Sequence, residues 1–308
     1  MKIAMLGAGA LGSYFGGRLA AAGEDVVLIG RGAHLAAIRE TGLRIESALG
    51  DADVRGVRTS EDPEEVGPVD AVLFLVKRYD TVEATRAMAP LVRPGTVVVT
   101  LQNGIDADRD ILAAGCAGRV FPGAAYIPAN IPRPGVVRHE TDRCRLVFGA
   151  RGADHPDELR ELARRLSTHG TEAVVDDDVI AQLFEKFAFL SSFAALTALT
   201  RLPIGPILAD GPASDLYFGA LSESVAVALA AEPRLPSDLL ERQTAMDRRL
   251  RPGVRASMLD DLERGKRIEL DYLSGAVVRL GGDLGIPTPV HAACYAALHP
   301  HVNGAAGR

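Results

Sequence analysis

The first 176 residues alternate short apolar runs with longer segments of helical periodicity. The apolar runs are rich in Val, Ile and Leu and are bounded by Gly, Pro or charged residues, which is typical of buried strands. These predicted strands cover residues 3–6, 25–29, 71–76 and 96–100, and predicted helices cover 10–22, 33–41 and 81–89. Because alternating strands and helices form βαβ units, the pattern predicts a parallel sheet with right-handed crossovers.

A second group of predicted strands follows, at residues 120–125, 136–139 and 145–148. Pro128, Pro132, Pro134 and Gly135 interrupt this group and favour turns and sheet edges. A helix at 155–167 and a strand at 172–175 are expected to complete the domain, with a minor hairpin or loop at 43–58.

The pattern changes after residue 176. A long apolar helix is predicted at 179–199, and no convincing strand follows it. Further helices are expected at 214–231, 237–250, 254–264, 269–280 and 289–298. We therefore predict an α/β domain over residues 1–176 and an all-α domain over 177–308. The acidic run 176–178 is interpreted as a helix cap rather than a metal site, because carboxylates satisfy and complement helix N-termini.

Composition excludes several function classes. A net charge of -6 argues against a nucleic-acid partner, which would require concentrated Lys and Arg. No apolar run approaches the roughly 20 residues that cross a bilayer, and the first residues lead directly into a strand instead of a secretory signal. The 3 cysteines lack CxxC spacing, so neither a disulfide framework nor a metal site is predicted. We expect a cytoplasmic protein.

Residues 7–12, GAGALG, form a GxGxxG motif between a predicted strand and a predicted helix. In this context Gly7 permits the tight turn, Gly9 lets a pyrophosphate approach the backbone, and Gly12 allows close packing of helix on strand. The following helix begins with Ala10 and Leu11, and its N-terminal N–H groups suit phosphate oxygens. The motif predicts a dinucleotide site in a Rossmann-type domain.

The end of the second strand distinguishes the two nicotinamide cofactors. NAD sites usually carry Asp or Glu about 20 residues beyond the glycines. Here the strand ends in Gly30 and Arg31. A guanidinium binds a 2'-phosphate that a carboxylate would repel, so Arg31 favours NADPH. The alternative is a solvated surface arginine.

Two further polar residues follow predicted strands. Lys77 comes after the strand at 71–76, and Asn103 comes after the strand at 96–100. Because ligands of open parallel sheets bind at the carboxyl ends of strands, both are expected beside the cofactor.

The chain resembles the ketopantoate reductase (2-dehydropantoate 2-reductase) family over nearly its whole length. The stretches that carry the resemblance are KIAMLGAGALG, VKRYDT, LQNG and PGVVRH in the first half, and LFEKFAFLSSFAALTAL and SMLDDLERGKRIELDYLSG in the second. The two C-terminal blocks are more specific than the glycine motif. The resemblance implies an NADPH-dependent reductase of a small 2-oxo acid, with a role in pantothenate biosynthesis.

The resemblance also implies roles for particular residues. Lys186 looks like the proton donor to the substrate carbonyl, and Glu269 looks like the acid that accompanies it. Ser257 matches a serine that contacts the substrate carboxylate, while Asn103 and Lys77 match residues on the cofactor and substrate sides. General chemistry agrees, because a cation aimed at the carbonyl oxygen stabilises the negative charge that develops during reduction.

One departure concerns the substrate. The family usually presents asparagines four and eight residues after the lysine, on the same helix face. Leu190 and Ala194 occupy those positions here. We therefore expect a 2-oxo acid, or a related carbonyl compound, with a more apolar side chain than ketopantoate.

Two other functions stay open at this point. A sensor that binds NADPH without chemistry would keep the glycines and Arg31 but would not require Lys186 and Glu269. A 3-hydroxy acid dehydrogenase shares the domain order, although the late RIELDYLSG block favours the ketopantoate reductase family. The sequence does not determine the oligomeric state, and a homodimer through the helical domain is only a conjecture.

Overall fold

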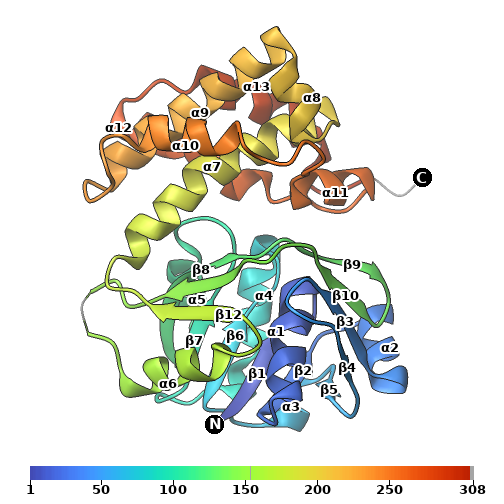
Figure 1. Ribbon diagram of the computed structural model, residues 1–308. Helices are drawn as coiled ribbons and strands as arrows, with labels where there is room; N and C mark the ends of the chain where they lie inside the picture. Colours follow the sequence, from blue (N-terminus) through green and yellow to red (C-terminus); the bar gives the residue numbers. More distant parts are fainter. Residues whose placement is uncertain (153, 306–308) are drawn as a thin grey trace. The chain divides into compact units, whose positions relative to one another are not determined.

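The computed structural model describes residues 1–152 and 154–305 and divides the chain into two compact units (Figure 1). The first unit comprises Met1–Gln102 and Asp106–Val179, and the second comprises Ile180 onward together with the short segment Asn103–Ile105. The boundary expected after residue 176 lies just before this division. The predicted order, a parallel-sheet domain followed by a helical domain, is confirmed.

The first unit contains an eight-stranded sheet in the order β12-β11-β8-β7-β6-β1-β2-β5. Its strands are β1 (Lys2–Leu6), β2 (Asp25–Ile29), β5 (Arg58–Ser60), β6 (Ala71–Phe74), β7 (Val97–Thr100), β8 (Arg119–Tyr126), β11 (Cys144–Phe148) and β12 (Thr171–Val175). Neighbouring strands from β8 to β5 are parallel, whereas β11 runs antiparallel to β8. Chain order reverses between β1 and β6, where open α/β sheets bind ligands.

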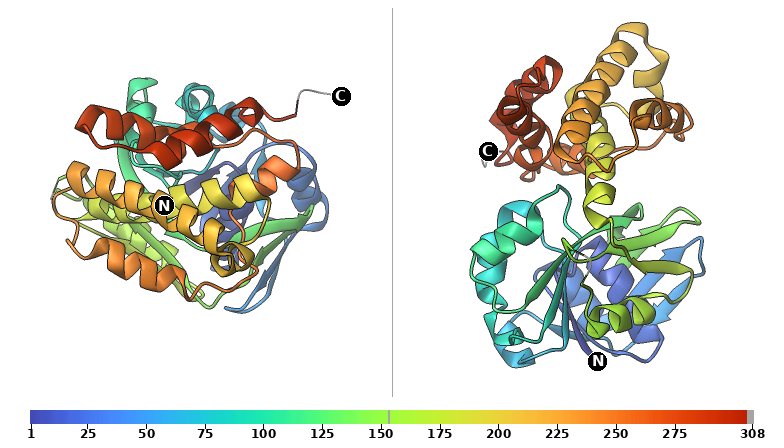
Figure 2. Two further views of the ribbon diagram at one scale, coloured as in Figure 1. Left: turned by 90° about the horizontal axis from the view of Figure 1, so that it is seen from above. Right: turned by 90° about the vertical axis from the view of Figure 1, so that its left-hand side faces the viewer.

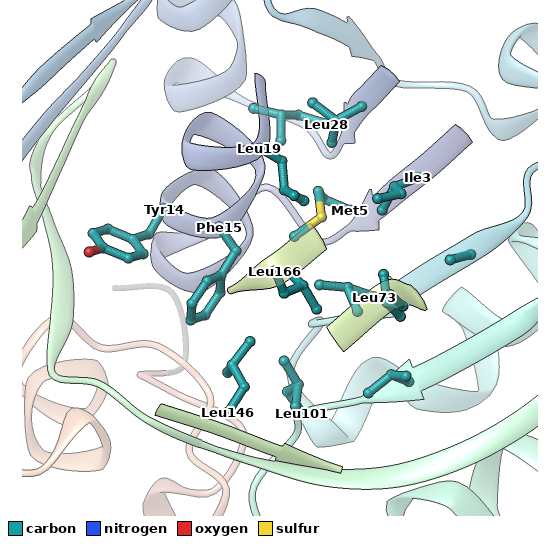
Figure 3. Close-up of a cluster of buried hydrophobic side chains, with 14 of the residues drawn as sticks. Ile3, Met5, Tyr14, Phe15, Leu19, Leu28, Leu73, Leu101, Leu146 and Leu166 are labelled. Carbon is teal, nitrogen blue, oxygen red and sulfur yellow. The ribbon is translucent and has the colours of Figure 1, made fainter. Parts of the chain in front are cut away.

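Alternate side chains of the sheet enter two separate cores, as the two-residue period of a strand requires. Ile3 and Met5 join the core under α1 (Ala10–Ala21) and α6 (Asp157–Leu166), part of which is drawn in Figure 3. Ala4 and Leu6 join the core on the other face, under α3 (Pro63–Val66), α4 (Thr81–Ala87) and α5 (Ala107–Ala113). The right-hand view of Figure 2 shows these helices on both sides of the sheet.

A smaller sheet, in the order β4-β3-β10-β9, lies beside α1 and α2 (Ala33–Thr41). Its strands are β3 (Leu43–Ser47), β4 (Ala52–Val54), β9 (Ala129–Arg133) and β10 (Val136–His139). The hairpin expected within 43–58 is β3–β4, and β3 also pairs with the distant β10. Pro132 is tolerated because β9 is an edge strand.

The described part of the second unit contains helices joined by loops, and no strand. It contains most of α7 (Val179–Thr200) and then α8 (Ile204–Ala209), α9 (Gly211–Ala231), α10 (Leu239–Asp247), α11 (Ser257–Glu263), α12 (Ser274–Leu284) and α13 (Pro289–Leu298). The expectation of one helix over 269–280 was wrong. The backbone forms a 3-10 turn, η3 (Leu270–Tyr272), and Leu273 then departs from helical geometry before α12 begins.

Helix α7 is long and apolar enough, by length and composition, to cross a membrane, with a mean hydropathy of 1.4 over its most apolar window. The sequence interpretation had found no such segment. This observation is weak evidence for a membrane span, because a helix buried in a protein core meets the same criteria. Of that window, 61% is buried inside the protein.

Candidate functional site

Three glycines shape the loop between β1 and α1. Gly7 has a φ of +109°, and a Cβ there would lie 2.8 Å from the carbonyl carbon of Leu75. A Cβ at Gly12 would lie 2.1 Å from the carbonyl oxygen of Gly7. At Gly9, by contrast, an added Cβ would meet no described atom within 4 Å. Gly7 and Gly12 therefore close the turn, while Gly9 leaves room for a ligand to approach the backbone.

Helix α1 begins without a side-chain cap. Gly9 is its N-cap residue, and the first turn contains no Asp or Glu. Ser13 N donates to the Gly9 carbonyl at 2.9 Å, so the N–H groups of Ala10, Leu11 and Gly12 precede the hydrogen-bond ladder of the helix. These N–H groups and the positive end of the helix dipole suit phosphate oxygens, which fits a dinucleotide.

The end of β2 packs directly on this glycine loop. The Ile29 carbonyl accepts hydrogen bonds from the N–H groups of Gly7 and Ala8, at 2.9 and 3.0 Å. A Cβ on Gly30 would lie only 2.9 Å from the Cβ of Ala8. The next residue, Arg31, is exposed, and within residues 1–152 and 154–305 its guanidinium makes no hydrogen bond or ion pair. A cation that carries no partner at this position can accept an anionic ligand.

Lys77 follows β6, and Asn103 follows β7. Gln102, a buried residue that sequence reasoning missed, connects the two loops. Its Nε2 donates to the Val76 carbonyl and to Thr81 Oγ1, both at 2.9 Å. The residue before Asn103 is thereby bonded to the residue before Lys77.

Arg78 connects the loop after β6 with the start of α5, within the first unit. Its side chain is fully buried, and Nη2 donates to Asp106 Oδ1 at 2.8 Å and to Asp110 Oδ2 at 2.6 Å. Arg78 follows Lys77 directly, and Asp106 is the residue before the first turn of α5. An arginine in a polar loop gives no sequence signal of burial, so this bridge was not foreseen.

In the second unit, Lys186 on α7 donates a hydrogen bond from Nζ to Asn103 Oδ1 at 3.1 Å. Glu269 is buried just before η3, and its charge acts on the Lys186 amine. Burial lowers the pKa of Lys186 to about 8, and the Glu269 carboxylate opposes this shift. The structure thus brings together Lys186, Asn103 and Glu269, three residues that the sequence assigned to one site.

Apolar side chains continue from Lys186 along α7. Leu190 lies one turn further on and is partly exposed, and Ala194 lies a turn beyond it and is buried. The rings of Phe189 and Phe193 stack with centroids 5.3 Å apart. A polar ligand group beside this segment of α7 would find no amide at either position.

Ser257, the remaining candidate, is the first residue of α11 and is exposed. In the part of the chain that the structure describes, its hydroxyl makes no hydrogen bond, and no contact links it to Lys186 or Glu269. The structure therefore does not bring Ser257 into the group around Lys186.

Comparison with known proteins gives the family. Residues 3–153 match the sequence profile described as ketopantoate reductase PanE/ApbA, and residues 178–302 match the profile of its C-terminal domain. The 2-dehydropantoate 2-reductase of Mesorhizobium japonicum is 31% identical, over 94% of each chain. The chain belongs to the ketopantoate reductase family. The resemblance inferred from the sequence motifs is confirmed.

Solved structures agree with this family assignment. A PanE/ApbA family ketopantoate reductase from Ralstonia eutropha JMP134 has a TM-score of 0.88 and 35% identity, covering 98% of both chains. D-mandelate dehydrogenase, solved with NADH and anilino(oxo)acetate, shares the fold with a TM-score of 0.86 at 24% identity over 98% of both chains. Several relatives are named 2-dehydropantoate 2-reductase, which assigns this chain to an enzymatic family of oxidoreductases that act on CH–OH groups.

Proposed function

We propose that this protein reduces the keto group of a small 2-oxo acid with NADPH, and that Lys186 protonates the carbonyl oxygen. When bound, NADPH supplies the hydride for the keto carbon. The observation that carries the proposal is the partly buried Lys186 amine, bonded to Asn103 and accompanied by Glu269. A sensor that only binds the cofactor has no need of this group.

The pKa of Lys186 suits proton donation. A donor is most effective when its pKa lies near the working pH, and burial lowers that of Lys186 to about 8. The nearby Glu269 carboxylate limits this shift, so most of the amine is protonated at neutral pH. Asn103 Oδ1 accepts one N–H of the ammonium and orients the others. The charge then stabilises the oxyanion more than the neutral ketone.

The choice of NADPH rests on Arg31. It lies next to the glycine loop, carries no described partner, and can pair with a 2'-phosphate bidentately. Because D-mandelate dehydrogenase, which shares the fold, was solved with NADH, both cofactors belong in the test. Arg31→Asp is expected to raise KM for NADPH far more than KM for NADH. An unchanged ratio of the two KM values would remove Arg31 from the proposal.

The substrate we favour is a 2-oxo acid with a less polar side chain than ketopantoate. Leu190 and Ala194 follow Lys186 on α7, and their side chains have no hydrogen-bond donor or acceptor. Where the protein offers no hydrogen-bonding group to the substrate side chain, it gives little preference for a hydroxyl there. Each extra methylene in an apolar pocket, by contrast, contributes about 1–3 kcal/mol to binding. Apolar analogues are therefore expected to react more efficiently than ketopantoate.

Steady-state NADPH oxidation over a panel of 2-oxo acids tests both parts. The panel contains ketopantoate, a branched aliphatic 2-oxo acid and an aromatic one, each with NADPH and with NADH. If no 2-oxo acid of the panel is reduced with either cofactor, the proposed reductase activity is refuted. A kcat/KM for ketopantoate at least as high as for every apolar analogue would refute only the substrate preference. If the apolar analogues react more efficiently, the double variant Leu190→Asn/Ala194→Asn should move the preference toward ketopantoate.

A further inference from the structure

A chain of side-chain hydrogen bonds reaches the glycine loop from outside it. The half-buried ring of His34, in the first turn of α2, accepts a hydrogen bond at Nδ1 from Gly135 N at 3.1 Å. On its other side, His34 Nε2 lies 3.0 Å from Ser13 Oγ. Ser13 Oγ in turn donates to the Ala8 carbonyl at 3.3 Å, within the glycine loop.

These contacts allow only one arrangement of hydrogens. A backbone N–H is always a donor, so His34 Nδ1 must carry a lone pair and Nε2 must carry the proton. Ser13 Oγ accepts that proton and uses its own hydrogen for Ala8. Burial lowers the pKa of His34, which favours this neutral form of the ring.

The chain of bonds starts in the smaller sheet. Gly135 forms the turn between β9 and β10 and has a φ of +77°. Its carbonyl accepts a hydrogen bond from Arg44 N of β3 at 2.9 Å, while its N–H donates to His34. The turn is thus bonded to β3 on one side and to the imidazole on α2 on the other.

We propose that His34 is a positioning residue for the dinucleotide site, because it holds Ser13 and thereby the Ala8 carbonyl in the shape that receives the cofactor. The inference rests on the proposed binding of NADPH by the glycine loop. A loop that already has its bound shape loses less free energy when ligand binds, so the effect belongs in cofactor affinity. The smaller sheet then has a role in cofactor binding through the β9–β10 turn.

Three substitutions distinguish the hydrogen bond at His34 Nδ1 from the hydrogen bond at His34 Nε2. His34→Asn keeps an acceptor at the Nδ1 position for Gly135 but is too short to reach Ser13. His34→Gln places an amide N–H near the Nε2 position and retains the bond to Ser13. Ser13→Ala removes the bonds to Ala8 and to His34 Nε2 and keeps the bond between His34 Nδ1 and Gly135.

His155 provides a matched control. Its Nδ1 also accepts from a backbone N–H, that of Ala150 at 3.1 Å, and its Nε2 bonds a side chain, Asp177 Oδ1, at 2.7 Å. These bonds are in the same unit as His34 and do not involve the glycine loop. His155→Asn therefore removes an equivalent bond without the proposed connection to the cofactor.

The experiment measures the Kd for NADPH by fluorescence titration, together with Tm, KM for NADPH and kcat. His34→Asn and Ser13→Ala are expected to weaken NADPH binding about fivefold, the effect of losing one hydrogen bond, with kcat at saturating NADPH unchanged. His34→Gln keeps the bond to Ser13 and loses only the acceptor for Gly135, so it should weaken NADPH binding less than His34→Asn does. His155→Asn should lower Tm alone.

The outcomes distinguish this inference from the proposed function. No NADPH binding by the unaltered protein would overturn both. Normal binding by the unaltered protein, with equal Kd in His34→Asn and Ser13→Ala, would overturn the inference alone. A loss of affinity in His155→Asn as large as in His34→Asn would also overturn it, because the effect would then be general destabilisation.

Discussion

Replacing Gly12 by Ala tests the physical basis of the glycine loop. The new Cβ would lie 2.1 Å from the Gly7 carbonyl oxygen and 3.1 Å from the Gly7 carbonyl carbon. Both are backbone atoms, and neither can rotate away as a side chain does. The loop or the start of α1 must therefore move by about 1 Å to restore normal contact.

The expected cost follows from this geometry. Overpacking that forces the backbone to shift costs about 1–3 kcal/mol, and contact with backbone places Gly12→Ala at the upper end. Alanine recovers up to about 1 kcal/mol through its better helix propensity. The net loss is about 2 kcal/mol, and at roughly 2–4 °C per kcal/mol Tm should fall by about 4–8 °C.

Gly9→Ala is the matched control, because an added Cβ there meets no described atom within 4 Å. Differential scanning fluorimetry and NADPH titration on both variants separate the two effects. We expect Gly12→Ala to lose stability and NADPH affinity, and Gly9→Ala to lose affinity with little change in Tm. A Gly12→Ala protein with the Tm and NADPH affinity of the unaltered protein would refute the reasoning.

Three further predictions concern single side chains. The proposed proton donor, Lys186, acts in its ammonium form, and burial lowers its pKa to about 8. The kcat/KM for a 2-oxo acid should therefore fall as pH rises through about 8, and a flat profile from pH 7 to 9 would contradict this. Burial raises the pKa of Asp247 to about 6 from 3.8, so protonation stabilises the fold at low pH and this contribution is lost as pH rises through about 6. In denaturant titrations Asp247→Asn should therefore gain about 2 kcal/mol relative to the unaltered protein between pH 4 and pH 7, and a constant difference would be evidence against it. Arg78→Met removes the buried guanidinium that pairs with two partly exposed carboxylates, so we expect kcat/KM to fall about tenfold with little change in Tm. A large fall in Tm with unchanged kcat/KM would show that Arg78 serves stability only.

Local signals predicted much of the fold and the first half of the site. The strands that contribute to the core in Figure 3 are short runs rich in Val, Ile and Leu, which the sequence pattern identifies. The glycine motif follows the first of these strands and marks the turn into α1. Pro289 marks the first residue of α13 just as the pattern predicts. Lys186 and Glu269 came from the family resemblance, since no local pattern connects residues so far apart in the chain.

Non-local structure could not be predicted in this way. The pairing of Arg44 with Val136 in the smaller sheet depends on contacts between distant segments, which leave no periodic signal. The break at Leu273 lies within a helical pattern and contains neither Gly nor Pro, so tertiary packing overrides propensity there. His34 likewise resembles a surface residue of a helix until its partner Gly135 is known.

The most direct test of the proposed chemistry is NADPH oxidation by Lys186→Met with the best 2-oxo acid of the panel, beside a titration of NADPH binding. Methionine keeps the volume of the side chain on α7 and removes the ammonium group. We predict that kcat falls by about 10²–10⁴-fold while the Kd for NADPH is unchanged. A Lys186→Met protein that reduces the 2-oxo acid at the rate of the unaltered protein would contradict the account.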